Sequence, residues 1–364
     1  MEVPQRNFTV ESFHAWLKEK AKDYSRRLKL VCLFSTFSDW EDPSQVLSLK
    51  RLLERRGFTV KAMGEIRELS TSYVEPVTDR TVQVKFYCHV SRDTQILHCF
   101  TTARGGDVKK TLSPVTEQPG LYDLWINPVA FEEIKKVILS RPGARVTRFV
   151  AKRVSSMSLD ARIRPEMGRT MIYFGDDAEQ TLEESSYQYG VIPDAMRFRV
   201  PGVGNLQIGR RGTFSYFGGE MSFLLESSDL AIDRVLRTKR IIDASRIEVV
   251  PLKTASRELE LIQFKPWTIE LGRPIGSEEL GDLFRELEAS KFAVYNSIIM
   301  KGSLHAESTI LDELKRTVFT VIANTHRISV SPRYQSTFES FYRFYQTIVE
   351  KFDSRARCTS SAAT

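Results

Sequence analysis

The sequence predicts an α+β fold, with mixed and mostly antiparallel sheets, flanking helices and a long amphipathic helix near the C-terminus. Many short runs alternate apolar and polar residues, which is typical of strands with one buried face. Other stretches place apolar residues at helical spacing and begin at a capping residue. The 364 residues are 41% hydrophobic and 27% charged, which is ordinary for a globular protein. A chain of this length can fold without a structural metal or disulfide.

An N-terminal α/β unit is predicted over residues 1–154. Thr9 caps an amphipathic helix over 9–24, and the apolar run over 28–36 predicts a strand. Helices are also predicted from Asp42 to Gly57 and from Asn127 to Ser140.

The same unit contains a predicted hairpin, formed by residues 82–90 and 94–101. If the turn is centred between Asp93 and Thr94, Cys88 lies opposite Cys99 and His89 lies opposite His98. Adjacent residues of a strand point to opposite faces, so these four side chains cannot surround one metal ion. We therefore predict buried thiols and no metal site here.

Residues 155–272 are predicted to form a strand-rich middle unit. Helices over 177–187 and 228–239 interrupt its short strands, and the segment from Gly209 to Gly212 predicts a tight turn. The predicted strands cover 170–174, 196–200, 213–217, 221–226, 240–250 and 259–264.

Residues 273–364 are predicted to form a C-terminal α/β unit. It has a helix over 277–290, strands over 291–300 and 318–330, and a helix beginning near Thr309 between them. Aromatic and aliphatic residues at helical spacing predict a final helix over 336–352, whose wide apolar face is a candidate surface for a protein partner or a second copy. We expect the polar tail after about residue 354 to be disordered.

The composition narrows the function classes. No apolar stretch is long enough to span a membrane, and Met1 to Thr9 lacks the pattern of a signal peptide. The four cysteines have no metal-type spacing, which favours a reducing compartment, and we expect a cytoplasmic protein. The net charge of +7 is compatible with a polyanionic partner.

A basic segment between residues 141 and 169 is the first candidate binding site. Guanidinium groups suit phosphates because they can donate two parallel hydrogen bonds. Simple alternation along the strand puts Arg145 and Arg153 on one face and Arg148 and Lys152 on the other, so the strand alone does not make one basic stripe. The candidate nucleic-acid-binding residues of this segment are Arg141, Arg145, Arg148, Lys152, Arg153, Arg162, Arg164 and Arg169.

A second basic feature is the predicted turn with Arg210 and Arg211, which precedes the aromatic residues Phe214 and Tyr216. Basic residues beside aromatic ones can hold a phosphate backbone and stack bases. The same pattern is also typical of an ordinary strand after a charged turn.

A looser pattern suggests catalysis. An acidic residue followed by an apolar strand with Glu or Gln, any residue and Lys is the arrangement of restriction-type nucleases, which hold Mg²⁺ with the acid and position the attacking water with the lysine. Asp243, Gln263 and Lys265 match it loosely. Mg²⁺ is the only cofactor that we weigh, and only under this alternative.

Three hypotheses follow. The first is a nucleic-acid-binding or nucleic-acid-associated protein that uses the basic residues and has no catalysis of its own. The second is a Mg²⁺-dependent nuclease of restriction type. The third is a scaffold or assembly subunit that uses the helix over 336–352. The sequence has no phosphate-binding loop, dinucleotide-binding glycine motif, nucleophile elbow or zinc-protease motif.

Overall fold

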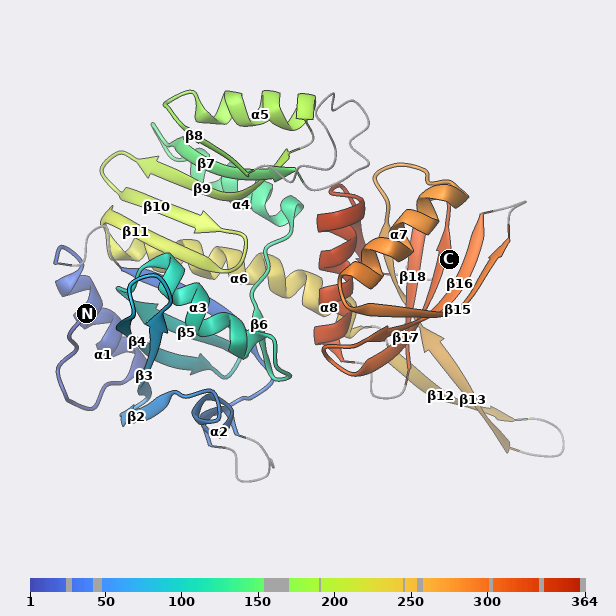
Figure 1. Ribbon diagram of the computed structural model, residues 1–364, viewed down its shortest axis with the longest axis horizontal. Helices are drawn as coiled ribbons and strands as arrows, with labels where there is room; N and C mark the ends of the chain where they lie inside the picture. The colour runs from blue at the N-terminus through green and yellow to red at the C-terminus, as the bar shows by residue number, and fades with distance from the viewer. Residues whose placement is uncertain are drawn as a thin grey trace.

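The computed structural model confirms the α+β class: two mostly antiparallel sheets are flanked by helices, and one helix stands between the sheets (Figure 1). The structure describes residues 1–23, 28–41, 48–153, 170–189, 191–244, 246–253, 258–300, 304–333 and 337–360. Among these residues, no helix combines the length and the apolar character that a membrane span requires.

The larger sheet joins the first two predicted units, because β1 pairs with β11 as well as with β5. Its eleven strands run in the order β2 (Thr59–Met63), β3 (Ile66–Glu75), β4 (Arg80–Ser91), β5 (Ile96–Thr101), β1 (Lys29–Ser35), β11 (Thr213–Gly219), β10 (Gly204–Gly209), β9 (Val191–Val200), β7 (Arg145–Arg153) and β8 (Thr170–Phe174), with β6 (Leu121–Asp123) paired to the other end of β1.

Helices cover the two faces of this sheet unequally. On one face, α1 (Val10–Lys20), α4 (Pro128–Leu139), α5 (Ala178–Tyr189) and α6 (Met221–Asp243) enclose the main core. On the other face, α2 (Leu49–Glu54) and α3 (Gly105–Thr116) enclose a second core over β1 to β5. No described helix packs on this second face over β7 to β11, where the side chains are half-buried or exposed.

The smaller sheet forms the C-terminal unit. Its strands run in the order β15 (Phe292–Met300), β16 (His305–Asp312), β17 (Thr317–Asn324), β18 (Arg327–Pro332), β14 (Trp267–Glu270) and β19 (Arg357–Ser360). Helices α7 (Ser277–Ala289) and α8 (Phe338–Thr347), the latter extended by a π-helical turn over Ile348–Phe352, pack on one face. A hairpin of β12 (Arg246–Lys253) and β13 (Glu258–Lys265) links the two sheets along the chain.

The two ends of the chain share one connectivity, although the sequence shows no repeat. In each, a strand and a helix are followed by four antiparallel strands and a second helix: β1, α2, β2 to β5 and α3, then β14, α7, β15 to β18 and α8. In both sheets the first strand lies beside the last, so β5 pairs with β1 and β18 pairs with β14. The similarity lies in the topology and not in the residues.

Helix α8 connects the two sheets, and this corrects its proposed role as a partner surface. Its aromatic face, including Phe341, Phe344 and Tyr345, is buried within the chain. Tyr342 donates to the backbone oxygen of Trp125, and the Trp125 indole nitrogen donates to Glu350 at 2.8 Å. The helix fills the space between the chain's own sheets (Figure 1), so it does not offer its apolar face to another protein.

Three further predictions were wrong. Residues 221–226 and 240–243 are not strand but the first and last turns of α6, since a short apolar run fits either structure and the helical stripe continues to Ile242. Thr309 does not begin a helix but lies within β16, because a β-branched capping residue also suits a strand. The tail is not disordered at 357–360, where β19 pairs with β14.

Candidate nucleic-acid interface

The face of β7 to β11 on which no described helix packs carries arginines from two neighbouring strands. Arg145 lies directly opposite Arg199, and Arg148 lies directly opposite Arg197. Because Phe198 between the two β9 arginines is buried, all four guanidinium groups point away from the main core. With Phe174, Gln207 and Phe217, which neighbour them on this face, they make up what we call the arginine face.

A β-bulge creates this arrangement and overturns the prediction from simple alternation. The register of β7 against β9 shifts between Val146 and Arg148. As a result Val146 and Phe149 are both buried, although they are three residues apart. Arg145 and Arg148 therefore share one face of the sheet instead of lying on opposite faces.

One row of side chains crosses the whole face in register. It runs through Phe174, Arg148, Arg197, Gln207, Ser215 and Lys29, on β8, β7, β9, β10, β11 and β1 respectively. Strands lie about 4.8 Å apart, so the row is about 24 Å long. At its end the Lys29 ammonium donates to the backbone oxygen of Ala103, immediately before α3 covers the rest of this face.

Few carboxylates balance these arginines. Arg145 lies 3.3 Å from Asp176, whereas no described carboxylate lies within ion-pair distance of Arg148, Arg197 or Arg199. The Nε atoms of Arg148 and Arg197 are buried and have no hydrogen-bond partner among the described residues. Burial lowers the pKa of both groups, and the charge of Arg148 lowers the pKa of Arg197 further. Like charges directly opposite each other in a sheet are unfavourable, and an anion placed between them would reduce this repulsion.

Aromatic rings and an amide hold the two central arginines in place. The Arg148 guanidinium lies 4.9 Å from the centre of the Phe174 ring, and that of Arg197 lies 3.8 Å from the centre of the Phe217 ring. Arg148 also donates to the Gln207 side-chain oxygen at 2.5 Å. These neutral contacts orient the guanidinium groups without neutralising them.

The other predicted basic residues lie elsewhere. Arg141 pairs with Glu226 at 3.0 Å, and Lys152 pairs with Asp194 at 3.0 Å. Arg162, Arg164 and Arg169, together with the side chain of Arg153, lie outside the described residues.

The turn between β10 and β11 forms as predicted, but both of its arginines are paired with carboxylates of the chain, and Arg210 is buried. Arg210 is only 2% exposed, and its Nη2 lies 3.7 Å from both Asp194 and Glu350. Arg211 pairs with Asp123 at 3.2 Å and with Glu350 at 3.9 Å. The prediction that Arg210 binds nucleic acid was therefore wrong, because its guanidinium group is enclosed.

Sequence reasoning missed Arg197, Arg199 and Phe174. The alternation of Met196, Phe198 and Val200 with two arginines was a usable signal, because it places both arginines on the face opposite the core. Only the pairing of β7 with β9 shows that these arginines meet those of the basic segment.

The nuclease pattern does not have the predicted geometry at Asp243. This residue ends α6 instead of lying on a strand, and its carboxylate pairs with Lys239. Gln263 and Lys265 do lie on one strand, β13, where Lys265 is exposed; the side chain of Gln263 lies outside the described residues. Within the described part of the chain, no three His, Cys, Asp or Glu side chains form a metal-binding group.

The predicted hairpin register is confirmed: Cys88 lies opposite Cys99 and His89 opposite His98. The two imidazoles stack with their centres 4.5 Å apart, and His14 of α1 packs on His89 at 5.4 Å. Burial, followed by the neighbouring histidines, lowers the pKa of His89 to about 2 and that of His98 to about 4. These histidines are therefore neutral core residues.

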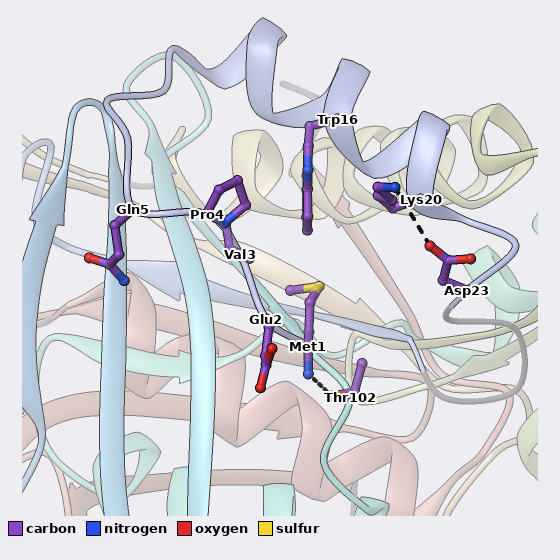
Figure 2. A pocket seen from close by; sticks show the side chains of 9 residues that line it. All are labelled: Met1, Glu2, Val3, Pro4, Gln5, Trp16, Lys20, Asp23 and Thr102. Atoms are coloured by element: carbon purple, nitrogen blue, oxygen red, sulfur yellow. Dashed lines mark hydrogen bonds and ion pairs between the residues drawn. The ribbon is translucent and has the colours of Figure 1, made fainter.

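A hollow of about 820 Å³ lies between the first five residues and α1 (Figure 2). Its charged side chains are Glu2, Lys20 and Asp23, of which Lys20 and Asp23 lie 3.9 Å apart. This set gives neither an excess of one charge nor an activated nucleophile. The arginine face is the stronger candidate, because it combines unbalanced charge with exposed aromatic surface.

Comparison with known protein families gives a match over the strands that carry the arginine face. Residues 144–211 match a family model described as the AF_0896_M family middle domain. This segment contains β7 to β10 and therefore all four arginines of the face together with Phe174. The chain is also similar to an uncharacterized protein of Archaeoglobus fulgidus, at 24% identity over 258 residues, which are 68% of this chain and 70% of that protein.

Proposed function

We propose that the protein binds nucleic acid through the arginine face and has no catalysis of its own. The observation that carries this proposal is the pairing of Arg148 with Arg197 across two strands, where no carboxylate of the described residues lies within ion-pair distance of either. A phosphate placed between them would accept hydrogen bonds from both guanidinium groups and would remove their mutual repulsion. Arg145 and Arg199, in the next row, extend the same surface toward a neighbouring phosphate.

The arrangement of the four arginines favours a polyanion over a single small anion as the ligand. The four arginines lie in two rows on two neighbouring strands, so they form a patch that can contact more than one phosphate of the same backbone. The contacts with Phe174 and Phe217 keep the guanidinium groups on the surface of the sheet. Proteins that bind nucleic acid without sequence preference combine positive charge and aromatic side chains in this way.

The proposal is tested with labelled DNA and RNA, by fluorescence anisotropy over a series of salt concentrations. The double variant Arg148→Gln/Arg197→Gln is compared with Arg141→Gln/Arg211→Gln, which removes the same total charge from arginines that are paired with carboxylates. We expect the first double variant to weaken binding at least about tenfold and to reduce the log–log salt slope by roughly 1.4 to 1.8.

The second double variant should bind nearly as well as the unmodified protein. An equal loss in both variants would show that only the net charge matters, and an absence of binding at low salt would overturn the proposal.

A further inference from the structure

Phe174 is a large apolar side chain that the fold leaves exposed. It lies on β8, the edge strand of the larger sheet, and its side chain is 64% exposed. Ile172, two residues earlier on the same face, is 54% exposed. Exposed aromatic and aliphatic residues beside unbalanced charge are typical of a binding surface.

The surroundings of Phe174 determine what its ring can bind. The Arg148 guanidinium lies over the ring at 4.9 Å, so the ring already takes part in a stacked contact. Most of the ring remains open to solvent, as its exposure shows. A flat apolar group can stack there, and a nucleobase offers such a face.

The register places phosphate-binding groups next to this ring. Arg148 lies one strand away from Phe174 in the same row, and Arg197 lies two strands away. These separations are roughly 5 and 10 Å across the sheet. A nucleotide whose base stacks on Phe174 would therefore have its flanking phosphates close to both arginines.

This geometry distinguishes single strands from duplexes. In a duplex both faces of each base are stacked on neighbouring base pairs, so a base cannot lie on a protein ring without being unstacked. A duplex could still place its phosphates on the arginines, but Phe174 would contribute little. An acidic peptide could also pair with the arginines, but it has no base to stack on the ring.

We propose that the row from Phe174 to Ser215 binds single-stranded nucleic acid across the strands, with an unpaired base on Phe174 and its flanking phosphates on Arg148 and Arg197. This inference rests on the proposed function and adds the class of nucleic acid. Gln207 and Ser215, farther along the row, offer neutral hydrogen-bonding groups to the next nucleotide.

The test compares labelled oligothymidylate and oligouridylate of about 12 nucleotides with a duplex of the same length and with poly-glutamate, all at one salt concentration. We expect the single strands to bind at least about tenfold more tightly than the duplex. Phe174→Ala should weaken single-strand binding by roughly 5- to 150-fold, the range that base–aromatic stacking supplies, and should weaken duplex binding far less, because the duplex loses only the ring's contact with Arg148.

Two control variants complete the design. Phe174→Tyr keeps the ring and should retain nearly all the affinity for single strands. Tyr295→Ala removes another exposed aromatic residue, on β15 of the C-terminal unit, and should change nothing.

The outcomes separate the two proposals. If Phe174→Ala has no effect on single strands, or weakens single strands and duplex equally, the stacking inference is wrong, while loss of binding in the Arg148→Gln/Arg197→Gln variant still supports nucleic-acid binding. If poly-glutamate binds as tightly as the oligonucleotides, both proposals fail.

Discussion

Two pairs of arginines that lie close together in the fold have opposite surroundings. Arg210 and Arg211 lie beside Asp194, Asp123 and Glu350, and Arg210 is almost fully buried. Arg148 and Arg197 lie beside each other and beside phenylalanine rings. The difference comes from residues far away in the chain, since Glu350 follows α8. Charge in a sequence therefore shows where a ligand could bind only after the carboxylates of the fold are known.

The largest effect on stability is expected at Arg210. In Arg210→Gln, Asp194 and Glu350 lose a cation that is buried between them. We expect the free energy of unfolding to fall by about 3 to 5 kcal/mol, measured by urea denaturation. The matched variant Arg211→Gln, at a side chain that is 59% exposed, should cost at most about 1 kcal/mol. Equal losses would show that burial does not separate the two residues.

The pH dependence of stability offers a second contrast between a buried and an exposed group. The pKa of His98 is lowered to about 4 in the folded state, below its unfolded value. Between these two values the unfolded state binds a proton at His98 and the folded state does not. Its contribution to stability is complete above about pH 6.5 and is lost as the pH falls toward 4. Between pH 6.5 and 5 this single group accounts for roughly 2 kcal/mol.

In His98→Gln, the fall in unfolding free energy over this pH range should therefore be smaller by that amount. His326→Gln, at an exposed loop position, serves as the control for the substitution itself. An unchanged slope in His98→Gln would contradict the burial of a neutral imidazole.

A smaller effect of the opposite sign is expected for the central arginines. The Arg148→Gln/Arg197→Gln variant removes two like charges that face each other. The free energy of unfolding should stay the same or rise by up to about 1 kcal/mol in urea denaturation. A fall in unfolding free energy similar to that of Arg210→Gln would mean that these arginines stabilise the sheet, which would contradict their assignment to a ligand.

The smallest change sharpens the comparison by giving Arg148 a carboxylate partner, as Arg210 and Arg211 have. Gln207→Glu places a carboxylate beside Arg148, which already donates to the Gln207 oxygen. We expect a gain in stability of about 0.5 kcal/mol and clearly weaker nucleic-acid binding. Gln207→Leu removes the hydrogen bond without adding charge. If it weakens binding as much as Gln207→Glu does, the added charge is not the cause.

The sequence could predict those features that depend on neighbouring residues. Thr9 accepts a hydrogen bond from Ser12 at the start of α1, and the hairpin of β4 and β5 has the expected register, because short-range capping and turn geometry determine both. The arginine face depends on a bulge near Arg148 and on the pairing of β7 with β9. Neither has a local signature, so the alternation rule assigned Arg145 and Arg148 to opposite faces.

The position of β1 in the centre of the larger sheet has a consequence for synthesis on the ribosome. Its residues Lys29 to Val31 pair with β11, which follows about 180 residues later, while β6 covers only the Leu33 to Ser35 end on that side. At typical translation rates, β11 is synthesised roughly 10 to 40 s after β1, and this edge of β1 stays unpaired during that time. Until then the nascent chain exposes an unpaired apolar strand, which is a template for aggregation. Rapid engagement by a chaperone is therefore expected early in translation, long before the arginine face exists.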